Sequence, residues 1–168
     1  MNVLWLVNIT LPEASILMNE SPSPFGGWLV NASALLAAEE EIKLSIAFSQ
    51  GGLKDIQFLK GERIVYYGFP QISEKDIKLS KPYNSLKKIL DQVKPDIVHI
   101  FGTEYAHTLA MVNTCNEQNI TAVISIQGLV SVYSNHYMAY LPLKVQNRYT
   151  LRDFVKQENL KKGQRNFV

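Results

Sequence analysis

The sequence predicts an α/β fold, with a Rossmann-like, doubly wound and mostly parallel sheet that carries helices on both faces. The main observation is that short apolar runs, typical of buried strands, alternate with helical segments of about 12–15 residues. Such alternation predicts right-handed crossovers between parallel strands. The composition agrees, because 168 residues that are 46% hydrophobic and 19% charged can fill the core of one ordinary domain.

Four apolar runs predict strands, because their apolar residues are continuous or alternate along the chain. A further pair of short runs around Gly61 predicts a hairpin, or an edge strand with its approach. The predicted strands are residues 2–9, 42–49, 96–101 and 121–127, and the hairpin pairs residues 56–59 with 63–69.

Helices are predicted where apolar residues recur every three or four positions. Pro95 ends one of them, because proline cannot donate the helical hydrogen bond, and Thr150 is placed to cap another. The proline-rich segment 10–25 is predicted to be a loop, and short turns are expected after Gly128. The predicted helices are residues 27–40, 80–94, 104–118 and a last one from about 150 to the end.

The cysteine content favours a reducing compartment, and the hydropathy pattern predicts no membrane span. The single cysteine, Cys115, lies in a helical pattern and is interpreted as a small buried thiol, and no Cys/His spacing predicts a metal site. No run reaches the roughly 18 apolar residues that a membrane span needs, and the N-terminus lacks the basic start of a signal peptide. We therefore expect a cytoplasmic protein.

The net charge of +2 is unevenly distributed. Residues 142–168 carry seven Lys/Arg side chains against two acidic ones, whereas residues 1–141 carry ten against thirteen. Such a basic segment is either a solvated helix or a surface for an anionic ligand, an acidic partner or a membrane face. Aromatic residues are not interleaved with a basic stripe, so nucleic acid is not an expected partner.

Ligands of doubly wound sheets bind beyond the carboxyl ends of the strands, near the reversal of strand order. Gly26 and Gly27 lie at such a position and open a helix, which they weaken by up to about 1 kcal/mol each relative to alanine. Either the turn needs positive backbone angles, or a phosphate approaches bare amides at the helix N-terminus. The G-x-G-x-x-G and P-loop patterns are absent, which excludes a standard dinucleotide fold and a P-loop hydrolase.

Polar residues mark two further strand ends. Glu104 either caps the next helix or binds a hydroxylated ligand, and His107 in the first helical turn can face the same crevice. Gln127 and Gly128 end a buried strand, where an amide can bind sugar hydroxyls or phosphate, or simply cap a turn. His99 lies mid-strand among apolar residues and is interpreted as a hydrogen-bonded core histidine.

Four stretches in order carry a family resemblance: "GGW" opening a long helix, "PDIVHIFGTE", "ISIQGLVS" and the tail "TLRDFVKQENLKKGQRNF". Over essentially all of its length the chain resembles the N-terminal half of bacterial glycosyltransferases of family 4, which have the GT-B fold. The resemblance implies a domain at 1–150 that faces a second domain across a cleft, with 151–168 as a helical segment leading towards that donor-binding domain. It also implies transfer with retention of anomeric configuration, without a bound metal or any cofactor besides the nucleotide-sugar substrate.

The resemblance also assigns roles to residues. Gly26 and Gly27 match the loop that reaches the donor's phosphates, and their free amides would stabilise the leaving diphosphate. Trp28 lies at the same edge, where it stacks on a sugar or packs. The acceptor side is then lined by Glu104, His107, Gln127 and Gly128. Many relatives have a histidine where this chain has Gln127, so an acid–base role at that position does not carry over.

The expected function is therefore the acceptor-side half of a retaining glycosyltransferase in surface polysaccharide or glycolipid biosynthesis, inactive by itself. Its expected partners are a nucleotide-sugar donor, a saccharide or lipid-linked acceptor and the missing C-terminal donor domain. The basic segment leaves peripheral contact with the inner face of the membrane open.

Two other classes of protein are alternatives to this prediction. One is a self-contained flavodoxin-like or receiver-like binding module; the first strand ends in "VNITLPE", without the acidic pair of a receiver. The other is a sugar epimerase or a similar nucleotide-binding enzyme, against which the missing Y-x-x-x-K and G-x-x-G-x-x-G patterns count.

Overall fold

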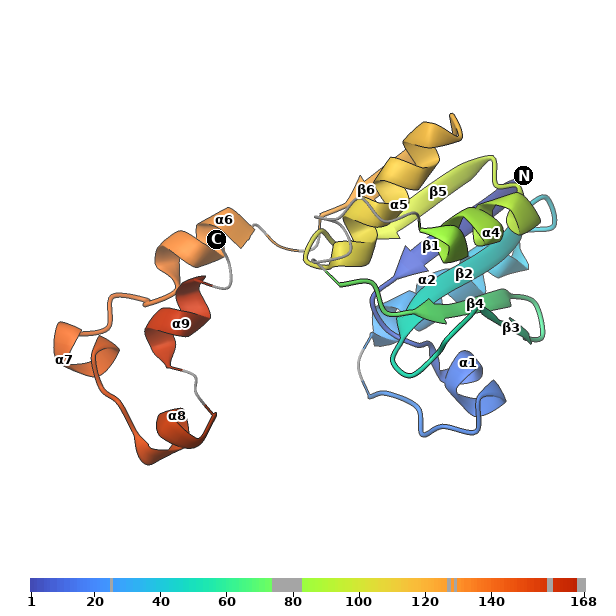
Figure 1. Ribbon diagram of the computed structural model, residues 1–168. Coiled ribbons are helices and arrows are strands. Elements are labelled where there is room, and N and C mark those ends of the chain that lie inside the picture. Colours follow the sequence, from blue (N-terminus) through green and yellow to red (C-terminus); the bar gives the residue numbers. More distant parts are fainter. Residues whose placement is uncertain (25, 74–82, 127, 129, 157–158, 166–168) are drawn as a thin grey trace. The chain divides into compact units, whose positions relative to one another are not determined.

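The computed structural model describes residues 1–24, 26–73, 83–126, 128, 130–156 and 159–165, in two compact units, Met1–Gln127 and Gly128–Val168 (Figure 1). The first unit holds a six-stranded sheet of order β3-β4-β2-β1-β5-β6, in which β3 is antiparallel to β4 and the other neighbours are parallel. The strands are β1 (Asn2–Val7), β2 (Lys43–Gln50), β3 (Gln57–Lys60), β4 (Val65–Pro70), β5 (Ile97–Phe101) and β6 (Ala122–Ser125). The predicted Rossmann-like, mostly parallel sheet is confirmed, including the hairpin.

Helices cover both faces of this sheet, as predicted (Figure 1). On one face lie α1 (Pro12–Leu17) and α2 (Gly27–Ala38), and on the other lie α4 (Asn84–Val93) and α5 (Ala106–Glu117). Successive β1 side chains point to opposite faces, so Trp5 packs in the first layer while Leu4 and Leu6 pack in the second. Each large buried apolar side chain stabilises the fold by about 1.5–3 kcal/mol.

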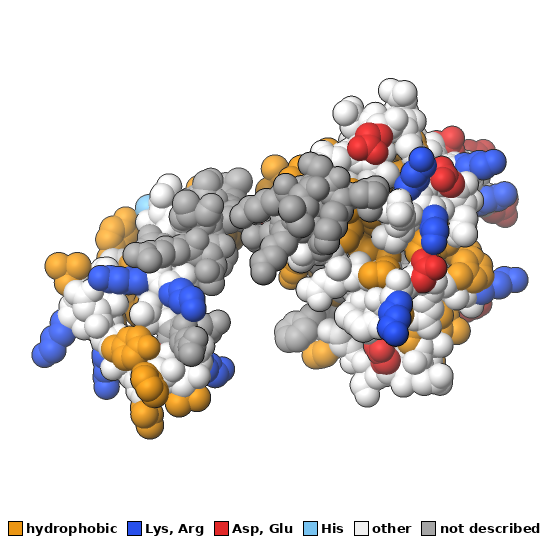
Figure 2. Space-filling model, viewed as in Figure 1, with side chains coloured by type: hydrophobic (Ala, Val, Ile, Leu, Met, Phe, Trp, Pro, Cys, Tyr) orange, Lys and Arg blue, Asp and Glu red, His pale blue; other side chains and the backbone are white. Residues whose placement is uncertain are grey.

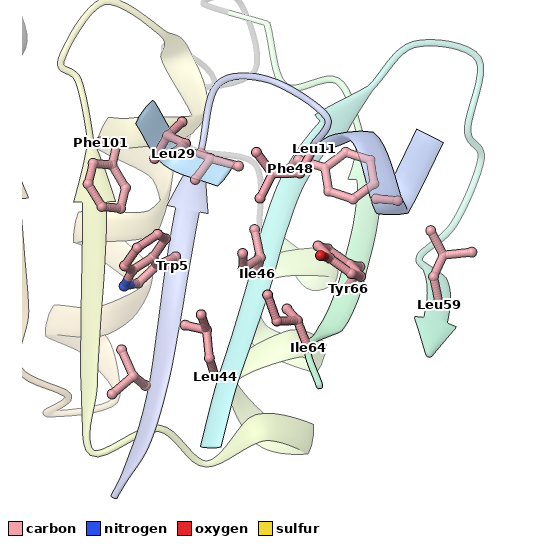
Figure 3. Close-up of a cluster of buried hydrophobic side chains, with 13 residues drawn as sticks. Trp5, Leu11, Leu29, Leu44, Ile46, Phe48, Leu59, Ile64, Tyr66 and Phe101 are labelled. Atoms are coloured by element: carbon pink, nitrogen blue, oxygen red, sulfur yellow. The ribbon is translucent and has the colours of Figure 1, made fainter. Parts of the chain in front are cut away.

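The layer beneath α1 and α2 is built from aromatic and branched residues of β1, β2, β4 and β5 (Figure 3). Trp5 and Phe101 lie towards α2, and Phe48 and Tyr66 lie towards α1. The opposite layer includes Cys115, whose thiol is buried as predicted and whose pKa burial raises to about 11. The thiol is therefore protonated and inert at neutral pH.

The loop predicted for residues 10–25 was wrong in part, because it contains the helix α1. Pro12 occupies its first turn, where the missing N–H costs nothing. Leu11 and Ala14 are buried against the sheet. The carboxylate of Glu13 accepts hydrogen bonds from the Glu62 amide and the Tyr66 hydroxyl, each at 2.7 Å. Tertiary contacts therefore stabilise a helix too short to form alone.

Other boundaries differ by a few residues. The helix predicted from residue 80 begins at Asn84, and residues 80–82 lie outside the described residues. Its end is correct, because Lys94 adopts a left-handed conformation before Pro95. The last predicted strand ends at Ser125 instead of at 127.

The second unit, Gly128–Val168, is more helical than predicted. Its helices are α6 (Val130–His136), α7 (Leu143–Gln146), α8 (Leu151–Lys156) and α9 (Leu160–Arg165). The prediction of short turns after Gly128 is therefore partly wrong, and so is the prediction of a single terminal helix. Thr150 does cap α8, since its hydroxyl accepts the Asp153 amide at 3.3 Å. Asn159 starts α9 in the same way, because its side chain accepts the Lys162 amide at 2.8 Å.

The prediction that residues 1–150 form one domain facing a second domain stays a prediction. Across the described residues, no helix combines the length and the hydropathy that crossing a bilayer requires.

Replacing Glu13 tests the tether that holds α1. Glu13→Ala removes two hydrogen bonds to a charged group and should lower the free energy of unfolding by about 1–3 kcal/mol, measured by urea denaturation. Glu40→Ala removes an exposed carboxylate near the end of α2 and should change it by less than about 0.5 kcal/mol. Equal effects of the two substitutions would contradict the tether.

Candidate functional site

The strand order places a crevice between the carboxyl ends of β1 and β5. The chain leaves β1 towards α2 on one face of the sheet, and it leaves β5 towards α5 on the other. Two neighbouring parallel strands whose connections diverge in this way leave a gap that helices do not fill. The sequence predicted a site at these strand ends, and a pocket lies there.

The pocket has a volume of about 210 Å³ and is lined by residues from β5, from the end of β1 and from the start of α2. Its walls are Asn8, Ile9, Gly26, Trp28, Leu29 and Phe101. Gly26 and Trp28 were predicted site residues, and the structure brings them together. Asn8 was missed, because the prediction extended the first strand to residue 9 and so placed this polar residue inside the strand.

The two glycines of the helix start differ in their surroundings. Gly26 is the N-cap of α2 with a φ of 81°, and a methyl group added to it would overlap the side chain of Ile9. Gly27 is exposed, and a methyl group there would meet nothing within 4 Å. The positive φ of the turn therefore explains why residue 26 is a glycine, which was one of the two alternatives predicted. No steric requirement explains the glycine at position 27.

Trp28 is anchored and yet exposed. Its ring contacts Phe101 edge to face, with centroids 5.5 Å apart and planes at 64°, while 53% of the residue stays accessible. Phe101 in turn contacts the buried Trp5 at 4.8 Å. Both expectations for Trp28 are thus compatible, because the residue packs on Phe101 and about half of it stays accessible.

Asn8 ties the two strand ends together and connects them to α5. Its side-chain nitrogen donates to the carbonyl of Phe101 at 2.8 Å, and its Oδ1 lies 2.9 Å from Nε2 of His107. A carbonyl can only accept, so this bond fixes which end of the amide is the nitrogen. Oδ1 therefore faces His107, and Nε2 of the histidine must carry the proton.

His107 is a buried, neutral histidine. Only 4% of it is exposed, and burial lowers its pKa to about 4 from an ordinary value of 6.5. Its ring stacks on Tyr105 with centroids 5.3 Å apart, and the edge of Phe69 closes another side. The residue contacts the pocket through Asn8, and it is not among the residues that line the pocket.

Glu104 folds back on its own turn instead of capping α5. Its carboxylate accepts the Thr103 amide at 2.9 Å, and the N-cap of α5 is Tyr105, which makes no side-chain capping bond. Gly102, the residue before Thr103, has a φ of 89°, and a methyl group there would meet the Asn8 amide at 2.6 Å. Glu104 therefore makes no capping hydrogen bond to α5, and both its interaction with the helix dipole and its binding of a ligand stay predictions.

The roles predicted for Gln127 and Gly128 stay predictions. Gln127 lies outside the described residues, and Gly128 begins the second unit. His99 is hydrogen-bonded as expected, with Nε2 2.7 Å from the Ser125 hydroxyl, and partial burial lowers its pKa. In the described part of the chain no three His, Cys, Asp or Glu side chains come together as metal ligands.

Comparison with known proteins agrees with the class of fold, which is a Rossmann-like α/β domain with a crevice at its strand reversal. No family model matches the chain, and no curated protein matches it. UDP-GlcNAc 2-epimerase from Neisseria meningitidis, solved bound to UDP-GlcNAc, is 20% identical with a TM-score of 0.50, covering 84% of this chain and 36% of its own. An E. coli trehalose-6-phosphate structure bound with UDP-2-fluoro glucose is 15% identical with a TM-score of 0.40, over 74% of this chain and 32% of its own.

The likeness to the epimerase shows the fold. The chain spans about a third of the length of both proteins.

Substitution at the two glycines should separate their roles in stability. Gly26→Ala places a side chain at a positive φ and against Ile9, so we expect it to lower the free energy of unfolding by about 1–3 kcal/mol in urea titrations. Gly27→Ala meets open space in a helix and should be neutral or stabilising by up to about 1 kcal/mol. Similar destabilisation by both would contradict this assignment.

Acid should destabilise the fold through His107. The folded pKa of about 4 lies below the ordinary 6.5, so the unfolded chain binds the proton first. The stability that neutral His107 contributes is complete above pH 6.5 and is lost as the pH falls towards 4, by up to about 3 kcal/mol. His107→Gln should flatten the pH dependence in urea titrations between pH 7 and 4, and subtracting the two profiles removes the contribution of carboxylates. Parallel profiles would refute the prediction.

Proposed function

We propose that this chain is the acceptor-side domain of a retaining glycosyltransferase, which moves a sugar from a nucleotide-sugar donor to a saccharide or lipid-linked acceptor. The observation that carries the proposal is the open glycine corner beside a pocket at the strand reversal. Gly27 has room around it that the fold itself does not need. A diphosphate approaching the first turn of α2 would use that room.

The proposed chemistry follows from where charge develops. When the sugar leaves the donor, the nucleoside diphosphate gains negative charge, and a helix N-terminus carries about half a positive charge. Gly26 has no side chain to cap the first turn, and the Leu29 amide bonds back to the Gly26 carbonyl at 2.9 Å, so the amides of Gly27 and Trp28 are the ones proposed to bind the diphosphate. Fixed dipoles that are already oriented stabilise such a leaving group without reorganisation. The reaction is proposed to need no cofactor besides the nucleotide-sugar and no bound metal.

The sites of the acceptor are proposed on the other side of the crevice. Glu104, Gln127 and Gly128 are the residues proposed to bind the acceptor, and His107 would act through Asn8. The donor would be held mainly by a second, C-terminal domain, which is a further part of the proposal. The chain by itself would then bind ligands without turnover.

The basic second unit suits an anionic, lipid-linked acceptor. Exposed apolar side chains such as Leu151 and Phe154 alternate there with Arg152 and Lys156, and Figure 2 shows the mixture of Lys/Arg and hydrophobic surface. Such a composition is typical of segments that lie on membrane surfaces. We propose peripheral contact with the inner face of the membrane, in the synthesis of surface polysaccharide or glycolipid.

Binding of UDP to the 168-residue chain tests the glycine corner. We expect Gly27→Val to weaken UDP binding on the order of tenfold in calorimetric titrations, because a branched side chain would cover the first-turn amides. Gly51→Val is the matched control, since Gly51 also has open space around it but lies in the turn after β2. If Gly27→Val binds UDP as the parent does, the diphosphate site is refuted.

A further inference from the structure

The pocket is the size of one sugar ring. Its volume of about 210 Å³ is below the roughly 300–1,000 Å³ of pockets that hold drug-sized ligands. A pocket of this volume suits a single pyranose ring better than a whole nucleotide-sugar. Its lining is apolar apart from the Gly26 backbone and one amide, Asn8, and a mainly apolar wall with few polar groups is typical of small-molecule sites.

Trp28 supplies a rigid aromatic face to this pocket. Its edge-to-face contact with Phe101, and the contact of Phe101 with the buried Trp5, hold the ring from one side. The two residues before Trp28 are glycines, which add no side chain next to it, and 53% of Trp28 is accessible. The C–H groups on one face of a pyranose carry partial positive charge and stack on the negative face of an aromatic ring.

Asn8 supplies the polar partner, and His107 fixes its orientation. An amide nitrogen carries two hydrogens, and the Phe101 carbonyl takes one of them, which leaves the second for a ligand hydroxyl. The Nε2–H of His107 holds Oδ1 at 2.9 Å and prevents the amide from turning over. Since His107 is buried and neutral, this arrangement persists across the physiological pH range.

We infer that the pocket binds one pyranose ring, stacked on Trp28 and hydrogen-bonded to Asn8, with His107 as the positioning residue for that amide. The inference rests on the proposed function, because it names the sugar-binding part of the same crevice. The ring belongs either to the acceptor or to the donor, and the two sources share the chemistry that the pocket recognises.

Nuclear magnetic resonance of the 168-residue chain tests the sugar site, because the chain has two tryptophans and one of them, Trp5, is buried. Titration with methyl β-D-glucopyranoside should shift the Trp28 indole signal and the Asn8 amide signals to saturation at millimolar concentration, and leave the Trp5 signal in place. Glycerol at the same concentration should have no such effect. An equal response to glycerol overturns the inference.

Variants separate the aromatic face from general surface effects. Trp28→Leu should weaken binding of the glucoside at least tenfold. Phe58→Leu is the matched control, since Phe58 is also exposed and also contacts a partner ring, Tyr67, edge to face, but lies on β3. The inference is overturned if Trp28→Leu keeps the parent affinity or if Phe58→Leu loses as much.

The role of His107 needs a rescue experiment. His107→Phe removes the donor and should reduce glucoside affinity several-fold and move the Asn8 amide signals in the ligand-free chain. His107→Gln can still donate to Oδ1 and should restore most of the affinity. Thermal unfolding confirms that both variants are folded at the temperature used. Unchanged affinity in folded His107→Phe overturns the positioning role.

Titration with UDP alone distinguishes this inference from the proposed function. In one outcome, UDP binds and Gly27→Val weakens this binding, but neither the glucoside nor the sugar of UDP-glucose causes a response. This outcome overturns the sugar site and supports the diphosphate site. Glucoside binding that depends on Trp28, without binding of UDP, supports the sugar site and refutes the diphosphate site. A Trp28 response to UDP-glucose beyond that to UDP, with none to the glucoside, assigns the ring to the donor.

Discussion

One hydrogen bond, from the Asn8 amide to the Phe101 carbonyl, closes the ends of β1 and β5 at the point where their connections diverge. The sheet reverses its strand order there, so helices cover opposite faces and leave a gap at the edge. The same amide accepts from His107 and crowds Gly102, which explains why a glycine with a positive φ follows β5. This one side chain, in the wall of the pocket, therefore ties together β1, β5 and α5.

The glycine pair shows how adjacent, identical residues can serve different ends. Gly26 lets the chain turn over Ile9 into α2, and that turn places Trp28 against Phe101. Gly27 is free of such constraints, and the helix would be more stable with alanine there. A stability cost without a steric reason is the pattern expected of a position selected for a ligand, and this is why the proposed diphosphate site centres on Gly27.

The succession of strands and main helices along the chain could be predicted from the sequence, because apolar periodicity reports burial directly. The helix α1 could not, since its stability comes from residues far along the chain: Glu13 reaches Glu62 and Tyr66. The contact of Asn8 with His107 could not be predicted either, because the two residues lie 99 positions apart. Gly26, Trp28 and the neighbourhood of His107 were predictable, since strand ends and helix starts are local features. Their convergence on one pocket depends on strand order, which periodicity does not encode.

The chemistry of the lining residues limits what the pocket can contribute to a reaction. None of the residues that line it is ionisable, and the nearby His107 is held neutral by burial. Such a pocket can recognise a ligand by shape, stacking and one amide, but it has no acid or base to move a proton at neutral pH. Under the proposed function, the first turn of α2 beside the pocket would help to balance the charge of the leaving group. The lining by itself therefore accounts for recognition of a ligand and not for proton transfer to or from it.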